Sequence, residues 1–179
     1  MVATKVAKRY AQALFELAEE KKLLDDVARE LGELRQCLGA SQELRNFIAD
    51  PVLTPDQKKQ VLRSLFNKQL NEFVLNFLLF LVDKRRLNLI DEIARIFNKS
   101  YLEYKNIADV EIISAFPMDE KQVQSICQKI QMKFKKDVRS HVTTDAGLIG
   151  GFKLRTQNLI YDFSFKTQLE RFRQSISTI

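Results

Sequence analysis

The spacing of apolar residues divides this chain into two parts and limits what each part can fold into. From residue 5 to about residue 105, apolar side chains recur at intervals of three and four residues, which is the period of an amphipathic α-helix. After residue 106 the stretch IADVEIIS alternates apolar with acidic residues, which is the period of a β-strand. The sequence therefore predicts a helical domain over residues 1–105 and a smaller α+β domain over residues 106–179.

The helical part contains six predicted helices, and residues of particular types mark their ends. Ser41 follows Gly39 and is expected to cap the third helix. In the stretch DPVLTPDQ, Pro51 ends one helix, Thr54 caps the next, and Gln57 has the spacing of a capping box. We expect a mainly α protein whose N-terminal part is a six-helix bundle.

The fifth predicted helix is the most apolar segment of the chain. It lies in the stretch NEFVLNFLLFLVDKRRLNLI and carries apolar side chains around most of its circumference. A helix of this kind is either central to a bundle or lends part of its surface to a partner protein. Both roles are compatible with this sequence.

The C-terminal part is predicted to contain four strands and two helices. One helix follows Pro117 and Asp119, and a final helix carries Leu169 and Phe172. The predicted strands cover residues 107–116, 137–145, 148–156 and 158–165.

The stretch DAGLIGGFKLR, residues 145–155, holds three of the five glycines in the chain and suggests a phosphate-binding loop. Its spacing matches neither a P-loop nor a dinucleotide-binding fingerprint. Both motifs also place their glycines before a helix, whereas a strand pattern follows here. We therefore predict that Gly150 and Gly151 form a bulge or tight bend in a small sheet.

The sequence offers no catalytic, metal-binding or cofactor site. His141 is the only histidine, and no cysteine pair or carboxylate cluster at ligand spacing accompanies it. Ser164 lies near Asp162 but lacks a positioned base. No apolar run approaches the roughly 18–20 residues that a membrane span needs. We expect a non-enzymatic protein that is soluble or peripheral to a membrane and uses no cofactor.

The net charge of +6 leaves a nucleic-acid-binding protein as an alternative hypothesis. Residues 1–105 carry 18 Lys and Arg against 15 Asp and Glu, and residues 106–179 carry 11 against 8, so each part contributes +3. The densest basic stretch, Lys133–Arg139, could bind phosphates in a regulatory protein. Lysines are also favoured at helix C-termini, and no aromatic platform of an RNA-binding type accompanies them.

Four stretches resemble, in the same order along the chain, the delta subunit family of F-type ATP synthases, whose mitochondrial member is called OSCP. They are RYAQALFELA, FLLFLVDKRRLNLI, ADVEIISAFPMDEKQ and DAGLIGGFKLRTQNLIYDFSFKTQLERF, and together they span nearly the whole chain. The last stretch is the most specific. Family members usually have Gly where this sequence has Phe163, a departure that concerns the turn before the last helix.

The resemblance implies a non-catalytic stator subunit. Its N-terminal domain, residues 1–105, would hold the N-terminal helices of the alpha subunits in grooves that include helices 1 and 5. Its C-terminal domain, residues 106–179, would bind the b-type subunits of the peripheral stalk. The catalytic head would then not turn with the rotor during proton-driven ATP synthesis. The protein would be peripheral to a bacterial plasma membrane, on its cytoplasmic side, or to a thylakoid membrane on its stromal side.

The same resemblance suggests partner-binding residues, many of which the sequence equally allows in the core. For the alpha subunit contact we expect Tyr10, Ala13, Leu14, Phe77, Phe80 and Leu81. For the stalk contact we expect Leu148, Ile149, Phe152, Leu169 and Phe172.

Overall fold

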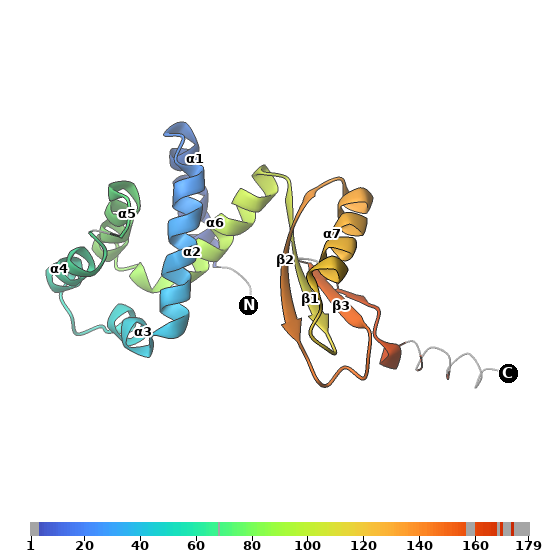
Figure 1. The fold of residues 1–179 in the computed structure, drawn as a ribbon. Helices are drawn as coiled ribbons and strands as arrows, with labels where there is room; N and C mark the ends of the chain where they lie inside the picture. The colour runs from blue at the N-terminus through green and yellow to red at the C-terminus, as the bar shows by residue number, and fades with distance from the viewer. Residues whose placement is uncertain (1–3, 68, 157–159, 168, 170–172, 174–179) are drawn as a thin grey trace. The chain divides into compact units, whose positions relative to one another are not determined.

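The chain divides into a helical unit and a unit built around a sheet (Figure 1). The computed structural model describes residues 4–67, 69–156, 160–167, 169 and 173, without the side chains of residues 133 and 134. The first unit comprises residues 1–101 and the second residues 102–179. The chain is therefore mainly helical with a small C-terminal sheet, as the sequence predicts.

The described residues of the first unit form six α-helices and one short 3-10 helix. These are α1 (Lys5–Glu20), α2 (Leu24–Ala40), α3 (Gln42–Ala49), α4 (Pro55–Phe66), α5 (Glu72–Asp83), η1 (Leu87–Leu89) and α6 (Ile90–Tyr104). The boundary between the units falls in the last turn of α6, a few residues before the position expected from the sequence.

The caps that the sequence predicts for α3 and α4 are confirmed. The Ser41 hydroxyl accepts a hydrogen bond from the Leu44 amide at 3.1 Å and so satisfies one free N–H of α3. At the start of α4, Thr54 Oγ1 accepts from the Gln57 amide, and the Gln57 side chain accepts from the Thr54 amide at 2.9 Å. This reciprocal pair is a complete capping box.

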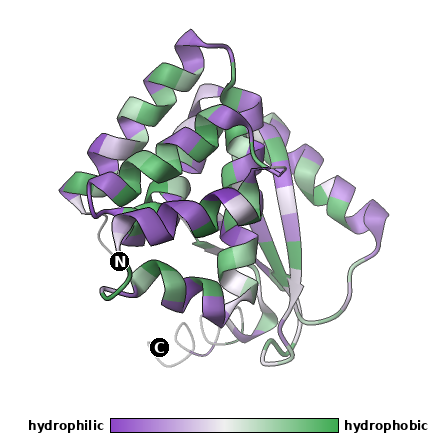
Figure 2. Cartoon of the chain, turned by 90° about the vertical axis from the view of Figure 1, so that its left-hand side faces the viewer, coloured by the Kyte–Doolittle hydropathy of each residue, from purple (hydrophilic) through white to green (hydrophobic). Residues whose placement is uncertain are grey.

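One hydrophobic core lies among the helices of the first unit. Figure 2 shows apolar and polar residues alternating around these helices, as expected for amphipathic helices. On α1 the buried face consists mainly of small residues, and the Phe15 ring meets the Phe97 ring of α6 in a tilted arrangement at a centroid distance of 5.6 Å. The buried residues of α1 are Ala7, Ala11, Leu14, Phe15 and Ala18, and those of α5 are Val74, Leu75, Leu78, Leu79, Leu81 and Val82.

The second unit contains a four-stranded sheet with the order β2-β1-β3-β4. Its described elements are β1 (Ile107–Ser114), α7 (Glu120–Phe134), β2 (Asp137–Thr144), β3 (Phe152–Thr156) and β4 (Ile160–Asp162). β1 and β2 are parallel and are joined through α7, whereas β3 is antiparallel to both β1 and β4. A parallel pair needs such a long crossover connection.

One face of the sheet packs its apolar residues together with α7. Val110, Ile112 and Leu154 form this core with Ile130 of α7. Because strand side chains alternate, the opposite face is polar and carries the ion pair between Arg155 and Glu111, at 2.9 Å.

All four strands are shorter in the described residues than the sequence predicts, and the largest differences lie before β3 and after β4. The segment before β3 is a bend over residues 148–151, because Gly151 adopts a positive φ of 81° that a regular strand does not allow. β4 ends at Asp162, and the described chain turns helical from Phe165. The tight bend predicted at Gly150 and Gly151 is confirmed.

Candidate protein-docking surfaces

A groove of about 780 Å³ runs between α1 and α5 on the surface of the helical unit. Its apolar walls are Tyr10, Ala13, Leu14 and Leu17 from α1, with Phe73, Phe77 and Phe80 from α5. Lys21, Leu23, Asn71, Glu72 and Asn76 complete the lining. Phe80 and Leu17 are 43% and 48% exposed, so large apolar surfaces face the solvent here.

The two helices that form this groove run antiparallel to one another. At one end the Tyr10 and Phe80 rings meet edge to face, with centroids 6.1 Å apart. At the other end the Lys21 ammonium lies 5.5 Å from the centroid of the Phe73 ring. Lys21, the C-cap of α1, lies eleven positions after Tyr10, which at the rise of an α-helix corresponds to about 16 Å, or three turns. The groove thus has the length of a short helix.

The structure brings five of the six residues expected to bind the alpha subunit into one groove. Tyr10, Ala13, Leu14, Phe77 and Phe80 all line it, although Leu14 is only 1% exposed and is mainly a core residue beneath the groove.

The sixth residue, Leu81, is a correction to the sequence prediction. Its side chain is fully buried in the core and does not belong to the groove lining, because α5 turns it about 100° away from Phe80 toward the interior, so a partner on the surface cannot reach it. Leu17 and Phe73 line the groove but were missed. The three- and four-residue spacing from Tyr10 to Leu17 is the signal that could have identified Leu17.

A second candidate surface lies in the sheet unit, where three chain segments are joined by backbone hydrogen bonds. The Ala115 amide donates to the Gly151 carbonyl at 3.3 Å, and the Phe165 amide donates to the Gly150 carbonyl at 3.0 Å. The Asp145 amide donates to the Ser114 carbonyl at 2.9 Å. We call this meeting point of residues 114–116, 145–151 and 163–165 the glycine junction.

The glycines of this junction allow the close approach of backbone. A Cβ added to Gly151 would lie 2.4 Å from the Phe163 carbonyl oxygen, and one added to Gly150 would lie 2.5 Å from the Phe165 ring. The amides of Gly147 and Leu148 donate to the side chain and carbonyl of Asp145, so both already have an acceptor within the loop. The stretch DAGLIGG is therefore a backbone junction and not a phosphate loop.

Several large apolar side chains are exposed at or near the glycine junction. They are Phe116 (70% exposed), Ile149 (68%), Phe165 (56%), Phe163 (45%) and Leu169 (62%). Such a concentration of exposed apolar residues is typical of a protein contact surface.

The five residues expected to contact the stalk differ in how far the structure exposes them. Ile149 and Leu169 are exposed, whereas Leu148 is buried and Phe152 packs against the core of the sheet. Leu148 is therefore corrected to a structural residue, whereas the half-buried Phe152 stays a predicted contact residue. Phe172 lies outside the described residues. Phe116, Phe163 and Phe165 were missed, because nothing in their local sequence distinguishes exposed from buried aromatic residues.

Phe163 occupies its position without the conformational freedom of the usual glycine. Among the described residues other than glycine, positive φ angles occur at Lys22, Arg85, Asn106 and Lys135 only. The Phe163 ring instead contacts the rings of Phe152 and Tyr161, with centroids 5.3 Å and 6.5 Å away. Phe163 thus fits its position through ring contacts, without a positive φ.

Asp162 organises the turn between β4 and the helical residues that follow. One of its carboxylate oxygens accepts from the Ser164 hydroxyl at 2.6 Å and from the Ser164 amide at 2.8 Å. These hydrogen bonds, and above all that of the Ser164 hydroxyl, hold the pKa of Asp162 well below its usual range. Lys153 lies 3.3 Å from the same carboxylate.

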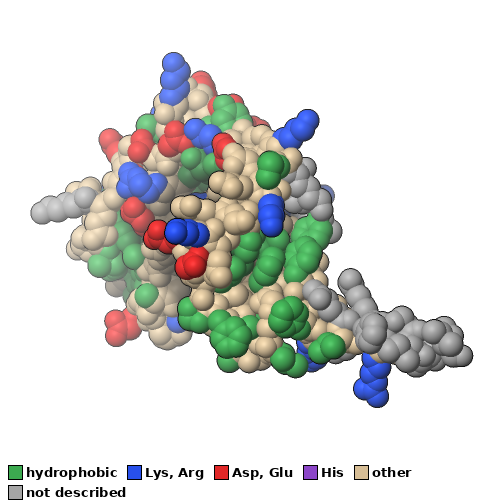
Figure 3. Space-filling view, turned by 45° about the vertical axis from the view of Figure 1, so that its right-hand side comes forward, with side chains coloured by type: hydrophobic (Ala, Val, Ile, Leu, Met, Phe, Trp, Pro, Cys, Tyr) green, Lys and Arg blue, Asp and Glu red, His purple; other side chains and the backbone are tan. Residues whose placement is uncertain are grey.

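The described part of the chain contains no group of three or more His, Cys, Asp or Glu side chains placed to hold a metal ion. On the face shown in Figure 3, hydrophobic side chains gather in patches, whereas Lys and Arg side chains are scattered. Of the basic stretch at residues 133–139, Lys135 serves as the left-handed C-cap of α7, with a φ of 52°. No helix within the described ranges is long and apolar enough to span a membrane.

Comparisons with known proteins agree with these features. The family model described as ATP synthase delta (OSCP) subunit matches residues 6–176. Proteins named ATP synthase subunit delta are similar over nearly their whole length. That of Trichlorobacter lovleyi is 38% identical over 172 residues, covering 96% of each chain, and that of Desulfitobacterium hafniense is 36% identical over 177 residues, covering 99% of each.

The fold has a counterpart among solved structures. A chain in the cryo-EM structure of the Toxoplasma gondii mitochondrial ATP synthase hexamer superimposes with a TM-score of 0.80 and 25% sequence identity, covering 97% of this chain and 98% of that one. The family match, the curated relatives and the shared fold give the same result: the chain belongs to the ATP synthase delta (OSCP) subunit family.

Proposed function

We propose that this chain links the catalytic head of an F-type ATP synthase to its peripheral stalk through two separate surfaces, one on each unit. Members of the delta (OSCP) family are non-catalytic stator subunits, and this chain is one of them. A stator subunit resists the torque of the rotor by binding tightly on both sides. It needs buried apolar area and a few well-placed charges, and no reactive group.

The groove between α1 and α5 is the proposed contact with the head, and the six N-terminal helices are its supporting bundle. The observation that carries this assignment is the exposure of Leu17 and Phe80 on a surface of helix length, next to a core that is already complete without them. An amphipathic helix laid into such a groove would cover these side chains. By resemblance to the family, we assign this helix to the N-terminus of an alpha subunit.

The exposed apolar residues around the glycine junction are the proposed contact with the b-type stalk subunits. Ile149 and Leu169 belong to the residues expected from the sequence, and Phe116 and Phe165 extend the same surface. We further propose that the complex holds this chain at the cytoplasmic side of a bacterial plasma membrane, or at the stromal side of a thylakoid membrane.

The test of the head contact uses the full chain and a synthetic peptide copying the N-terminal 20 or so residues of an alpha subunit from the same complex. Titration calorimetry should show saturable binding with one peptide per chain, and a negative heat-capacity change from apolar burial. A peptide of the same composition in scrambled order should not bind. If the folded chain does not bind the native peptide, the proposed head contact is wrong.

A further inference from the structure

Glu30 is a charged residue buried in the apolar face of α2, with only 3% of its surface exposed. Its neighbours on that face of the helix are apolar, among them Val27, Leu31 and Leu34. Removing a carboxylate from water is costly unless charges and hydrogen bonds compensate for it. An apolar residue would fill the same space without this cost, so the question is what the carboxylate does there.

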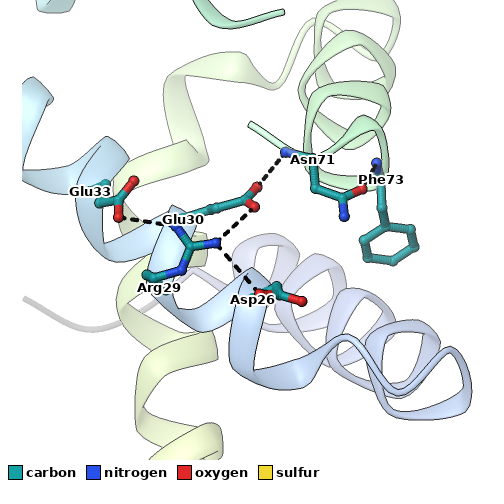
Figure 4. A network of polar contacts seen from close by, with 6 residues as sticks. All are labelled: Asp26, Arg29, Glu30, Glu33, Asn71 and Phe73. Atoms are coloured by element: carbon teal, nitrogen blue, oxygen red, sulfur yellow. Dashed lines mark hydrogen bonds and ion pairs between the residues drawn. The ribbon is translucent and has the colours of Figure 1, made fainter. Parts of the chain in front are cut away.

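Two contacts compensate the buried carboxylate (Figure 4). The backbone amide of Asn71 donates to Glu30 Oε2 at 2.8 Å, and Arg29 Nη2 lies 3.5 Å from Glu30 Oε1. Arg29 is also paired with Asp26 and Glu33, on the outside of α2. The Glu30 carboxylate thus connects the charged surface of α2 to a backbone group that lies 41 residues further along the chain.

Asn71 is the N-cap of α5, so this hydrogen bond acts on the beginning of a helix. The Asn71 side chain accepts from the Phe73 amide at 2.9 Å, while the Asn71 backbone is held by Glu30. A negative charge is also favourable beside the N-terminus of a helix because of the helix dipole. Glu30 therefore stabilises the start of α5 in two ways: its hydrogen bond holds the Asn71 backbone in place, and its negative charge interacts favourably with the helix dipole.

The start of α5 forms one end of the groove. Asn71, Glu72 and Phe73 all line it, and Lys21 faces the Phe73 ring across it. The residues of α2 itself do not belong to the lining; Leu23, which does, immediately precedes the helix. At this end, α2 contacts the groove-lining residue Asn71 through the Glu30 carboxylate, without lining the groove itself.

We propose that Glu30 is a positioning residue of the groove: its carboxylate holds the start of α5 against α2 and thereby sets where Phe73 lies opposite Lys21. The consequence for partner binding rests on the proposed docking of a helix in this groove. Loss of the carboxylate should loosen the Phe73 end and leave the Tyr10–Phe80 end in place.

The first test examines the free full-length chain by NMR, with Glu30→Gln compared to Glu33→Gln. Glu33 pairs with the same arginine but does not contact Asn71, so Glu33→Gln is a matched control. Glu30→Gln should weaken the contact between Lys21 and the Phe73 ring and speed hydrogen exchange of the Asn71 amide about tenfold. The Tyr10–Phe80 contact should stay, and the control should change neither end.

The second test measures the affinity for the alpha-subunit peptide. Glu30→Gln should weaken binding about fivefold to tenfold, which corresponds to the net contribution of one ordinary hydrogen bond. In double-mutant cycles the loss should couple to Phe73→Ala at the same end and be additive with Phe80→Ala at the other end. A general loss of stability would not distinguish the two ends.

If Glu30→Gln does not fold, Glu30→Asp replaces it, because it keeps the charge but withdraws the carboxylate by one methylene from the Asn71 amide. Unchanged Asn71 exchange and an unchanged Lys21–Phe73 contact overturn the proposal, and so does equal loosening of both ends. If the unaltered chain does not bind the peptide, the proposed head contact fails, while the NMR comparison still decides the role of Glu30.

Discussion

At the scale of single residues, backbone conformation and one carboxylate hold the glycine junction together. Gly151 has a positive φ, and the Phe163 carbonyl oxygen lies where its Cβ would be. One carboxylate oxygen of Asp162 accepts hydrogen bonds from both the amide and the hydroxyl of Ser164. These groups act over a few ångströms, and each makes a prediction that a single substitution can test.

Gly151→Ala should destabilise the sheet unit by about 1–3 kcal/mol, because alanine is strained at this φ and its methyl group meets the backbone at residue 163. Urea unfolding of the full chain measures the change.

Gly32→Ala is the matched control for that substitution. Gly32 lies in α2 with open space around its missing Cβ, so alanine there should stabilise the helical unit by up to about 1 kcal/mol. Equal effects of the two substitutions would contradict the role given to Gly151.

Asp162 should make the stability of the sheet unit sensitive to acid. Its pKa is lower in the folded chain than in the unfolded chain, so its stabilising contribution is present above the unfolded value of about 3.9 and is lost as the pH falls further toward the folded value. Asp162→Asn should lower the free energy of unfolding at pH 7 by about 1 kcal/mol. It should also flatten the dependence of that free energy on pH below 4.

Unfolding curves at pH 7 and at pH 3 measure both effects. Asp119→Asn is a suitable comparison, since Asp119 caps α7 in the same unit but is not part of this turn. If Asp162→Asn and the unaltered chain lose stability in parallel on acidification, Asp162 is not the responsible group.

At the scale of elements, α1 and α5 each carry two apolar surfaces. On α1 the core face is built mainly from alanines, which leaves the larger Tyr10 and Leu17 on the groove side. On α5 the core face is made of Leu and Val, and the aromatic Phe77 and Phe80 lie in the groove. The fifth helix is apolar around most of its circumference because one side packs in the core and another side lines the groove.

Phe80→Asp should weaken binding of the alpha-subunit peptide at least tenfold, because it places a charge in the apolar contact and removes the ring that meets Tyr10. The stability of the chain should change little, because Phe80 is 43% exposed. Calorimetric titration and thermal unfolding measure the two effects.

Leu65→Asp provides the control for charge on an exposed helix. Leu65 is 48% exposed on α4 and does not line the groove, so its substitution should leave peptide affinity unchanged. Unaltered affinity of Phe80→Asp would remove Phe80 from the contact.

At the scale of the whole molecule, the two proposed contacts lie on separate compact units. Substitutions in one should therefore act independently of those in the other. Phe80→Asp should abolish or weaken binding to the alpha-subunit peptide only, and Ile149→Asp should weaken binding to the soluble part of a b-type subunit only. Pull-down with each partner, using the full chain and the double variant, measures this.

In that experiment the double variant should lose both partners, each to the same extent as in the single variant. Loss of b-type binding by Phe80→Asp would show that one surface serves both partners, contrary to the proposal. Gel filtration of every variant serves as the check of folding.

The sequence by itself determined the types of the elements, many of their ends and the family. Periodicity, the caps at Ser41 and Thr54 and the bend at Gly151 depend on residues within a few positions of each other, so they can be recognised without knowing the fold. The predicted groove residues of α1 and α5 came from the family resemblance, which itself rests on short local stretches of sequence.

Only the tertiary structure decided which apolar residues are core and which are surface. Leu81 and Phe80 are adjacent and equally apolar, yet one is fully buried and the other is 43% exposed, because the helices that cover α5 on one side come from distant parts of the chain. The pairing of Glu30 with the Asn71 amide was likewise invisible in the sequence, since a carboxylate on a helix is usually solvated and its partner lies 41 residues away. Burial depends on long-range packing, which no local pattern specifies.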